Sequence, residues 1–194
     1  VILFYGAVPR MVVLLVFTVI LRYISISSHE DAQRIADLTY RKETDLGTHL
    51  YNKNKYEEMI TEYYPTVDRL AAVFWDVNNL KYVNDKYGHA AGDGLIQTLA
   101  AVLYELSTDR RKVYRIGGDE FVALCRGMAE EELYREVEEL RAELDREHVT
   151  MAVGAAVNTL GAVGFDHLLT EPERRMYQDK AEYYRQSGLN RRRQ

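Results

Sequence analysis

One stretch decides the fold, Lys112–Cys125, which has the sequence KVYRIGGDEFVALC. Its two ends, Lys112–Ile116 and Phe121–Cys125, are short runs rich in Val, Ile, Tyr and Phe, as is typical of strands. Between them lies Gly117–Glu120, and paired glycines let a chain reverse direction tightly. The stretch therefore predicts an antiparallel hairpin that carries two carboxylates, Asp119 and Glu120, at its tip.

The elements on either side of this hairpin alternate in type. Short apolar runs at Leu70–Trp75 and Val149–Val157 predict two further buried strands. Helical spacing of apolar residues, or a proline at one end, predicts helices over Asn52–Tyr64, Leu95–Leu106, Ala129–Arg146 and Pro172–Ser187. This order of elements predicts one sheet with helices packed on it.

Composition excludes several classes of protein. Of the 194 residues, 47% are apolar and 28% are charged, which excludes a disordered chain. The formal net charge of −5 argues against a nucleic-acid partner, because such proteins present a basic face. Cys125 is the single cysteine, so an intramolecular disulfide and a cysteine-rich zinc site are both excluded.

Residues 1–28 differ sharply from the rest, since Arg10 and Arg22 are their only charged residues. Met11–Ser27 is as long as the shortest membrane-spanning helices, which need roughly 17 residues. In a membrane helix, Arg22 would mark the cytoplasmic side. The alternative is a pair of buried strands with a turn at Pro9-Arg10, forming the tail of an upstream sensor domain. Both interpretations remain open at this point.

Residues 29–44 are polar and form a linker between the apolar segment and the domain expected over residues 45–194. Within this linker, Ile35 and Leu38 lie on one face of a predicted helix. The helix is either a solvated connection or a dimerising signalling helix. Since the first residue is Val, we expect the chain to be a piece of a longer protein.

Acidic residues follow the predicted strands. Asp76 comes directly after Leu70–Trp75, and three carboxylates meet if that strand lies beside the hairpin that carries Asp119 and Glu120. Oxygen ligands without His or Cys suit Mg²⁺ or Mn²⁺, and two such ions about 4 Å apart suit phosphoryl transfer. The alternative is a turn in which Asp119 only accepts hydrogen bonds from backbone amides.

Other polar residues near this strand could bind a nucleotide. The turn Val77–Lys81 would offer backbone N–H groups to an anion, with Lys81 adding charge. Asn84 and Asp93 could recognise the hydrogen-bonding edge of guanine, or they could cap helices. Lys180, on the last helix, is positioned either to reach a phosphate or to lie in solvent.

Taken together, these motifs resemble the GGDEF family of diguanylate cyclases over roughly residues 45–190. The matching blocks are Asp45–Lys53, Asp76–His89 with Gly92-Asp93, Gly117–Phe121, Val149–Gly154 and Met176–Lys180. The family pattern has an Arg one turn after the helical Lys, where this chain has Tyr184, and the adjacent Arg185 is expected to replace it. Many relatives also carry an inhibitory R-x-x-D motif. Thr108 and Arg111 stand at its positions, so the resemblance implies that product feedback is absent.

The resemblance also implies roles for individual residues. Asp76 and Asp119 would ligate the metal with help from the Val77 carbonyl, and Glu120 would complete the acidic cluster or orient the attacking 3′-hydroxyl. Asn84 and Asp93 would bind guanine. The phosphates would be held by the backbone of Asn79, Leu80 and Lys81 together with Lys180 and Arg185.

The fold implied is an α/β (α+β), palm-like and ferredoxin-related domain with a mostly antiparallel sheet flanked by helices. The activity implied is the condensation of two GTP into cyclic di-GMP, a bacterial second messenger, with release of pyrophosphate. Mg²⁺ or Mn²⁺ would be the cofactor and a homodimer would be required. The catalytic domain would be cytoplasmic and tethered to the inner membrane or to a sensor domain. The alternative is a catalytically silent GGDEF domain that binds GTP or a partner.

Overall fold

The computed structural model describes residues 2–159 and 165–187. The chain divides into two compact units, and the boundary lies between Lys42 and Glu43. This boundary is close to the predicted start of the domain at Asp45.

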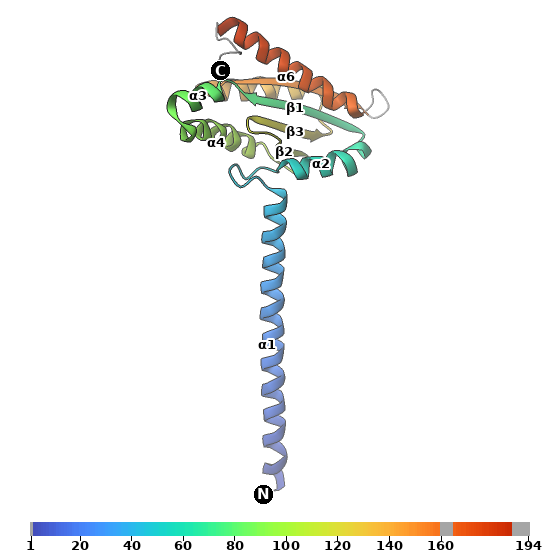
Figure 1. Ribbon diagram of the computed structural model, residues 1–194. Helices are drawn as coiled ribbons and strands as arrows, with labels where there is room; N and C mark the ends of the chain where they lie inside the picture. Colours follow the sequence, from blue (N-terminus) through green and yellow to red (C-terminus); the bar gives the residue numbers. More distant parts are fainter. Residues whose placement is uncertain (1, 160–164, 188–194) are drawn as a thin grey trace. The chain divides into compact units, whose positions relative to one another are not determined.

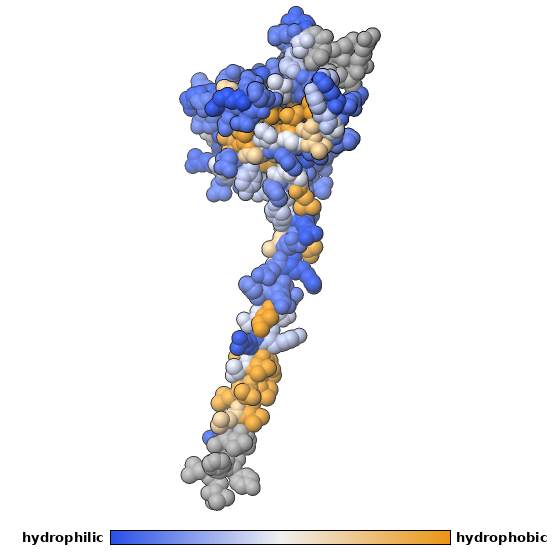
Figure 2. Space-filling model, turned by 90° about the vertical axis from the view of Figure 1, so that its left-hand side faces the viewer, coloured by the Kyte–Doolittle hydropathy of each residue, from blue (hydrophilic) through white to orange (hydrophobic). Residues whose placement is uncertain are grey.

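The first unit is a single helix, α1 (Ile2–Glu43), shown in blue in Figure 1. It continues through the predicted apolar segment and the linker without a break, so the alternative of a pair of buried strands is wrong. The large apolar side chains of residues 11–26 are exposed, and they colour the visible side of this segment orange in Figure 2. The part of α1 from Arg10 is long and apolar enough to cross a membrane, judged by length and composition.

The second unit is built on a four-stranded antiparallel sheet with strand order β2-β3-β1-β4. Its strands are β1 (Arg69–Val77), β2 (Arg111–Arg115), β3 (Glu120–Arg126) and β4 (Met151–Thr159). The predicted hairpin is confirmed as β2 and β3. β1 lies between β3 and β4, and every residue after its first is buried. A sequence that is apolar at consecutive positions is typical of such a central strand.

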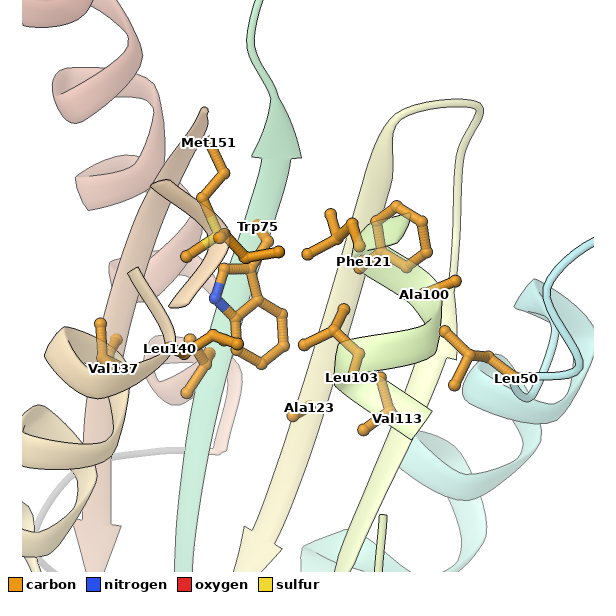
Figure 3. Packing of buried hydrophobic residues seen from close by; sticks show 14 of the residues in the cluster. Leu50, Trp75, Ala100, Leu103, Val113, Phe121, Ala123, Val137, Leu140 and Met151 are labelled. Atoms are coloured by element: carbon orange, nitrogen blue, oxygen red, sulfur yellow. The ribbon is translucent and has the colours of Figure 1, made fainter. Parts of the chain in front are cut away.

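Helices cover both faces of this sheet (Figure 1). They are α2 (Lys53–Glu62), the short 3₁₀ helix η1 (Tyr64–Thr66), α3 (Leu80–Tyr87), α4 (His89–Glu105), α5 (Glu130–Arg146) and α6 (Phe165–Ser187). Successive strand residues point to opposite faces. Trp75 therefore packs with residues of α4 and α5, including Leu103 and Leu140 (Figure 3), whereas its neighbour Phe74 packs with residues of α2 and α6.

The structure corrects the predicted start of the last helix. α6 begins at Phe165, not at Pro172, and Pro172 lies inside it. Proline is common at the first turn of a helix because it lacks an N–H group, and this preference led to the wrong boundary. The Pro172 carbonyl instead lies against Gly154 of β4, so the proline belongs to a close contact between helix and strand.

Candidate active site

The predicted acidic residues lie at one end of the central strands. Asp76 of β1 is paired directly with Glu120 of β3 in the antiparallel register. The Val77 backbone N–H donates a hydrogen bond to the Asp119 carbonyl at 3.1 Å. The sheet register therefore brings all three acidic residues to the same edge of the sheet. The sequence predicted this meeting only if the Asp76 strand lies beside the hairpin, and β1 does pair with β3.

The Asp76 side chain is buried beside a positive charge. Only 3% of the residue is exposed, and burial raises the pKa of its carboxyl to about 6. The charges of Asp119 and Glu120 also raise this pKa, whereas the hydrogen bond from Lys180 lowers it. The Lys180 ammonium contacts the Asp76 carboxylate directly, and both side chains are largely buried. A buried carboxylate with two acidic neighbours requires a cation, and here the ammonium supplies that charge.

The position of Lys180 depends on how α6 packs against β4. Gly154 has no side chain, and a Cβ atom there would lie 1.9 Å from the Pro172 carbonyl oxygen and 2.4 Å from the Met176 nitrogen. The helix backbone therefore lies directly on the strand. Directly after Met176, the Tyr177 hydroxyl donates a hydrogen bond to Glu120 Oε1 at 3.3 Å. Close packing at Gly154 thus brings α6 to the acidic edge.

The turn after β1 leads into α3 through Asn79, which has a positive φ of 60°. No side chain caps the N-terminus of this helix. Two tyrosines of α6 reach the turn instead. The Asn79 backbone N–H donates to the Tyr184 hydroxyl at 3.4 Å, and Asn79 Nδ2 donates to the Tyr183 hydroxyl at 2.5 Å. The buried side-chain oxygens of Asn78 and Asn79 have no hydrogen-bond partner.

Sequence reasoning missed Tyr183 and noted Tyr184 only as a departure from a motif. Their spacing of three and four residues from Lys180 places them on the same side of a helix, and this was the available signal. Arg185, which was expected to bind phosphate, is exposed and forms a bidentate ion pair with Glu182. The structure therefore does not bring Arg185 to the acidic edge, and its predicted role rests on the motif alone.

Asn84 and Asp93 lie where α3 and α4 pack together. A Cβ atom at Gly92 would lie 2.0 Å from Asn84 Oδ1, so the Asn84 amide lies against the backbone next to Asp93. Neither residue caps a helix, because the N-cap residues of α3 and α4 are Asn79 and Gly88. Asp93 is exposed on α4. The capping interpretation is therefore wrong for both residues.

Lys81 is exposed in the first turn of α3. Arg115, just before the hairpin tip, has a structural role that the sequence did not reveal. Its guanidinium donates to Asp45 Oδ1 at 3.0 Å and to the Gly118 carbonyl at 2.8 Å. It therefore ties the turn that begins the domain to the tip that carries Asp119.

The acidic residues offer the type of ligand atom that a hard divalent cation prefers. Over residues 2–159 and 165–187, no three His, Cys, Asp or Glu side chains are gathered closely enough to hold a metal ion. The Asp76 carboxylate already interacts with a positive charge, the Lys180 ammonium. Its acidic neighbours, Asp119 and Glu120, offer only oxygen atoms as ligands. Such ligands suit Mg²⁺ or Mn²⁺ rather than zinc.

Comparison with known proteins identifies relatives of this chain. A family model described as "Diguanylate cyclase, GGDEF domain" matches residues 42–186. Diguanylate cyclase DgcZ of Escherichia coli is 29% identical over 164 residues, covering 79% of this chain and 54% of that protein. Probable diguanylate cyclase DgcE of the same organism is 36% identical over 96 residues, covering 47% of this chain and 9% of that protein. The chain thus spans about half or less of the length of these relatives.

Solved structures share the fold. The coiled coil and GGDEF domain of DgcB from Caulobacter crescentus, solved in complex with c-di-GMP, superimposes with a TM-score of 0.73 at 20% identity. That match covers 84% of this chain and 93% of the DgcB chain. The FimX GGDEF domain from Pseudomonas aeruginosa gives a TM-score of 0.65 at 17% identity, covering 72% and 94% of the two chains. At these identities the likeness establishes the palm-like α+β fold with its antiparallel sheet.

Proposed function

This chain belongs to the GGDEF domain family of diguanylate cyclases, and from that premise we propose that it is an active cyclase that converts two GTP into cyclic di-GMP. The observation that carries the proposal is the buried Asp76 carboxylate, which faces Glu120 and is neutralised by Lys180. A folded protein retains such a costly arrangement of charges most readily where function requires it. The adjacent uncapped end of α3 supplies donors for phosphate oxygens.

Asp76, Asp119, Glu120 and the Val77 carbonyl would hold Mg²⁺ or Mn²⁺. When bound, this cation neutralises charge on the triphosphate as the α-phosphorus is attacked. With a metal ion held at Asp76, the Lys180 ammonium would bind the phosphates. The backbone N–H groups of residues 79–81 hold further phosphate oxygens.

The reaction forms one bond and breaks one bond in each half. The 3′-oxygen of one GTP attacks the α-phosphorus of the other, and the bond to the β-phosphate breaks to release pyrophosphate. Glu120 orients the 3′-hydroxyl and accepts its proton, and Tyr177 holds the Glu120 carboxylate. Repetition with the roles exchanged closes the ring. Most of the rate acceleration then comes from positioning the 3′-oxygen against the α-phosphorus and from neutralising the charge of the triphosphate.

Asn84 and Asp93 select the base. The Asp93 carboxylate accepts hydrogen bonds from the guanine N1–H and exocyclic amine, which adenine cannot offer. The amide of Asn84, held against Gly92, contacts the acceptor side of the same edge. Both side chains act only on the nucleobase and not on the reacting phosphorus.

Each domain offers one nucleotide site, so two copies must face one another to join two GTP. We propose that the exposed apolar part of α1 crosses the inner membrane and that the domain lies on the cytoplasmic side. The polar part of α1 would bring two domains together. The relatives are longer than this chain, which is consistent with an upstream sensor domain in the full protein.

The direct test incubates the chain, in detergent, with Mg²⁺ and GTP, with and without ATP, and identifies products by mass spectrometry. Cyclic di-GMP and pyrophosphate are expected, and the Asp76→Asn variant serves as the control. GTP binding without any product would show a silent signalling domain and overturn the proposal. A mixed guanine–adenine dinucleotide would overturn the assigned base selectivity.

A further inference from the structure

One face of α6 covers the site with its own side chains. Tyr177 binds Glu120, Lys180 binds Asp76, and the pair Tyr183–Tyr184 binds Asn79. These residues recur at helical spacing, so they extend from the acidic edge of the sheet to the start of α3. Each of these side chains has a partner that a bound nucleotide or its metal would need.

The tyrosine pair is the part of this face that lies at the start of α3. Tyr183 accepts hydrogen bonds from Asn79 Nδ2 and, at 3.5 Å, from the Thr150 hydroxyl. Tyr184 accepts from the Asn79 backbone N–H. The two rings pack edge to face with their centres 5.5 Å apart, and both residues are half-buried. The pair is therefore held by packing as well as by hydrogen bonds.

A phenol oxygen and a phosphate oxygen compete for the same donor. The Asn79 N–H group points to Tyr184 and is one of the donors at the start of α3, where no side chain caps the helix. Lys180 lies one turn earlier on α6, where its ammonium is paired with Asp76, and in the proposed function this ammonium binds the same triphosphate. A phosphate forms a charge-assisted bond with the N–H group, whereas a phenol forms a neutral and weaker one.

We propose that Tyr183 and Tyr184 form an internal plug that occupies the phosphate position at the start of α3 and must be displaced by the triphosphate. The inference rests on the proposed function only in taking a nucleoside triphosphate as the ligand. The plug lowers the affinity of the site for GTP without touching the acidic residues. Displacing the tyrosine pair costs its hydrogen bonds to Asn79. Only a ligand that also binds the metal and Lys180 gains enough free energy to offset this cost, so weakly binding anions are excluded.

The test measures binding separately from turnover. The double variant Tyr183→Phe/Tyr184→Phe keeps both rings and removes only the hydroxyls. Isothermal titration calorimetry is performed with 3′-deoxy-GTP and Mg²⁺, because this nucleotide lacks the attacking hydroxyl and cannot react, and then with inorganic pyrophosphate. Losing two competing hydrogen bonds should lower both dissociation constants by about three- to tenfold. Tyr184→Phe alone should show a smaller decrease of the same sign.

Tyr104→Phe is the matched control, since Tyr104 is exposed on α4, and its dissociation constants should equal those of the wild type. Unchanged or weaker binding in the double variant would overturn the plug. The plug would also be overturned if neither the wild type nor the variant bound either probe, because removing a plug must expose a phosphate site. Damage to the fold would weaken binding, so it cannot imitate the expected result.

The plug and the cyclase assignment can fail independently. Tighter binding of both probes in a chain that makes no cyclic di-GMP would support the plug and overturn the activity. Cyclic di-GMP production with equal affinity in both proteins would support the activity and overturn the plug.

Discussion

The acidic edge of the sheet and the α3–α4 corner differ in how their polar side chains are held. At the acidic edge, Asp76 is 3% exposed, is paired with Lys180 and has a raised pKa because of burial. At the corner, Asp93 is exposed on α4, and Asn84 lies against Gly92 without capping a helix. One region holds a charged pair inside the protein, and the other presents a carboxylate to solvent.

The two regions therefore differ in how much their charged groups reduce the stability of the fold. Burying a carboxylate beside two others costs stability even when a lysine compensates part of the cost. Exposed groups on a helix surface cost almost nothing to keep. Substitutions at the acidic edge should therefore lower activity and stability together, whereas substitutions at the corner should change substrate choice and leave both the fold and the chemical step intact.

The largest effect is expected from Asp76→Asn. The variant keeps the shape and can still accept the hydrogen bond from Lys180, but it loses the charge that holds a metal. Cyclic di-GMP production should fall by about 10²–10³-fold, and the midpoint of thermal unfolding should also fall, because the buried Lys180 ammonium loses its partner charge. Asp145→Asn, at an exposed position on α5, is the control. Retention of more than a tenth of the activity would contradict the metal assignment.

The corner is tested by Asp93→Ser. Guanine loses the acceptor for two of its donors, so the preference for GTP over ATP should fall by roughly 10- to 100-fold. The thermal midpoint should not change, because Asp93 is exposed. The measurement compares kcat/KM for the two nucleotides in Asp93→Ser and in the surface control Asp145→Ser. Equal losses for GTP and ATP would show a structural role for Asp93 and remove the contrast between the regions.

Gly154→Ala should displace α6 without changing a site residue, and so it separates the acidic edge from the α3–α4 corner. The added Cβ would meet the Pro172 carbonyl at 1.9 Å, and such overpacking costs about 1–3 kcal/mol of stability. Because α6 carries Lys180 and Tyr177, activity should fall while the preference for GTP over ATP is kept. Gly94→Ala is the matched control. A Cβ there meets nothing within 4 Å, and the exchange should stabilise α4 by about 0.5–1 kcal/mol in denaturant unfolding.

The smallest effect is expected from adding cyclic di-GMP. Arg111 stands where an inhibitory motif would have its Asp, and it donates to Glu136 of α5 and to the Leu106 carbonyl. Like the groups at the acidic edge, this charge already has protein partners. Cyclic di-GMP titrated to micromolar concentrations should leave the initial rate unchanged. Inhibition that disappears in Arg110→Ala/Arg111→Ala would reveal a product site.

Much of this site was predictable from local sequence. Lys112–Cys125 predicted the hairpin of β2 and β3, and the apolar run before Asp76 predicted the central strand; both are confirmed. Strand pattern and glycine placement are local signals, and they express the preferences of the residues themselves. The start of α6 at Phe165 was not predicted, because the preference for Pro at a helix start was overridden by packing on β4.

The chemical groups of the site can be read from the amino-acid sequence. They are three acidic residues next to strands, an amide and a carboxylate that could bind a base, and a lysine on the last helix. Only the tertiary structure decided which of them meet. Antiparallel register set Asp76 opposite Glu120, and packing of α6 on Gly154 placed Lys180 on Asp76 and Tyr184 on Asn79. The partners of these pairs are far apart in the chain, so no local preference encodes the contacts, which form only when the sheet and α6 pack together.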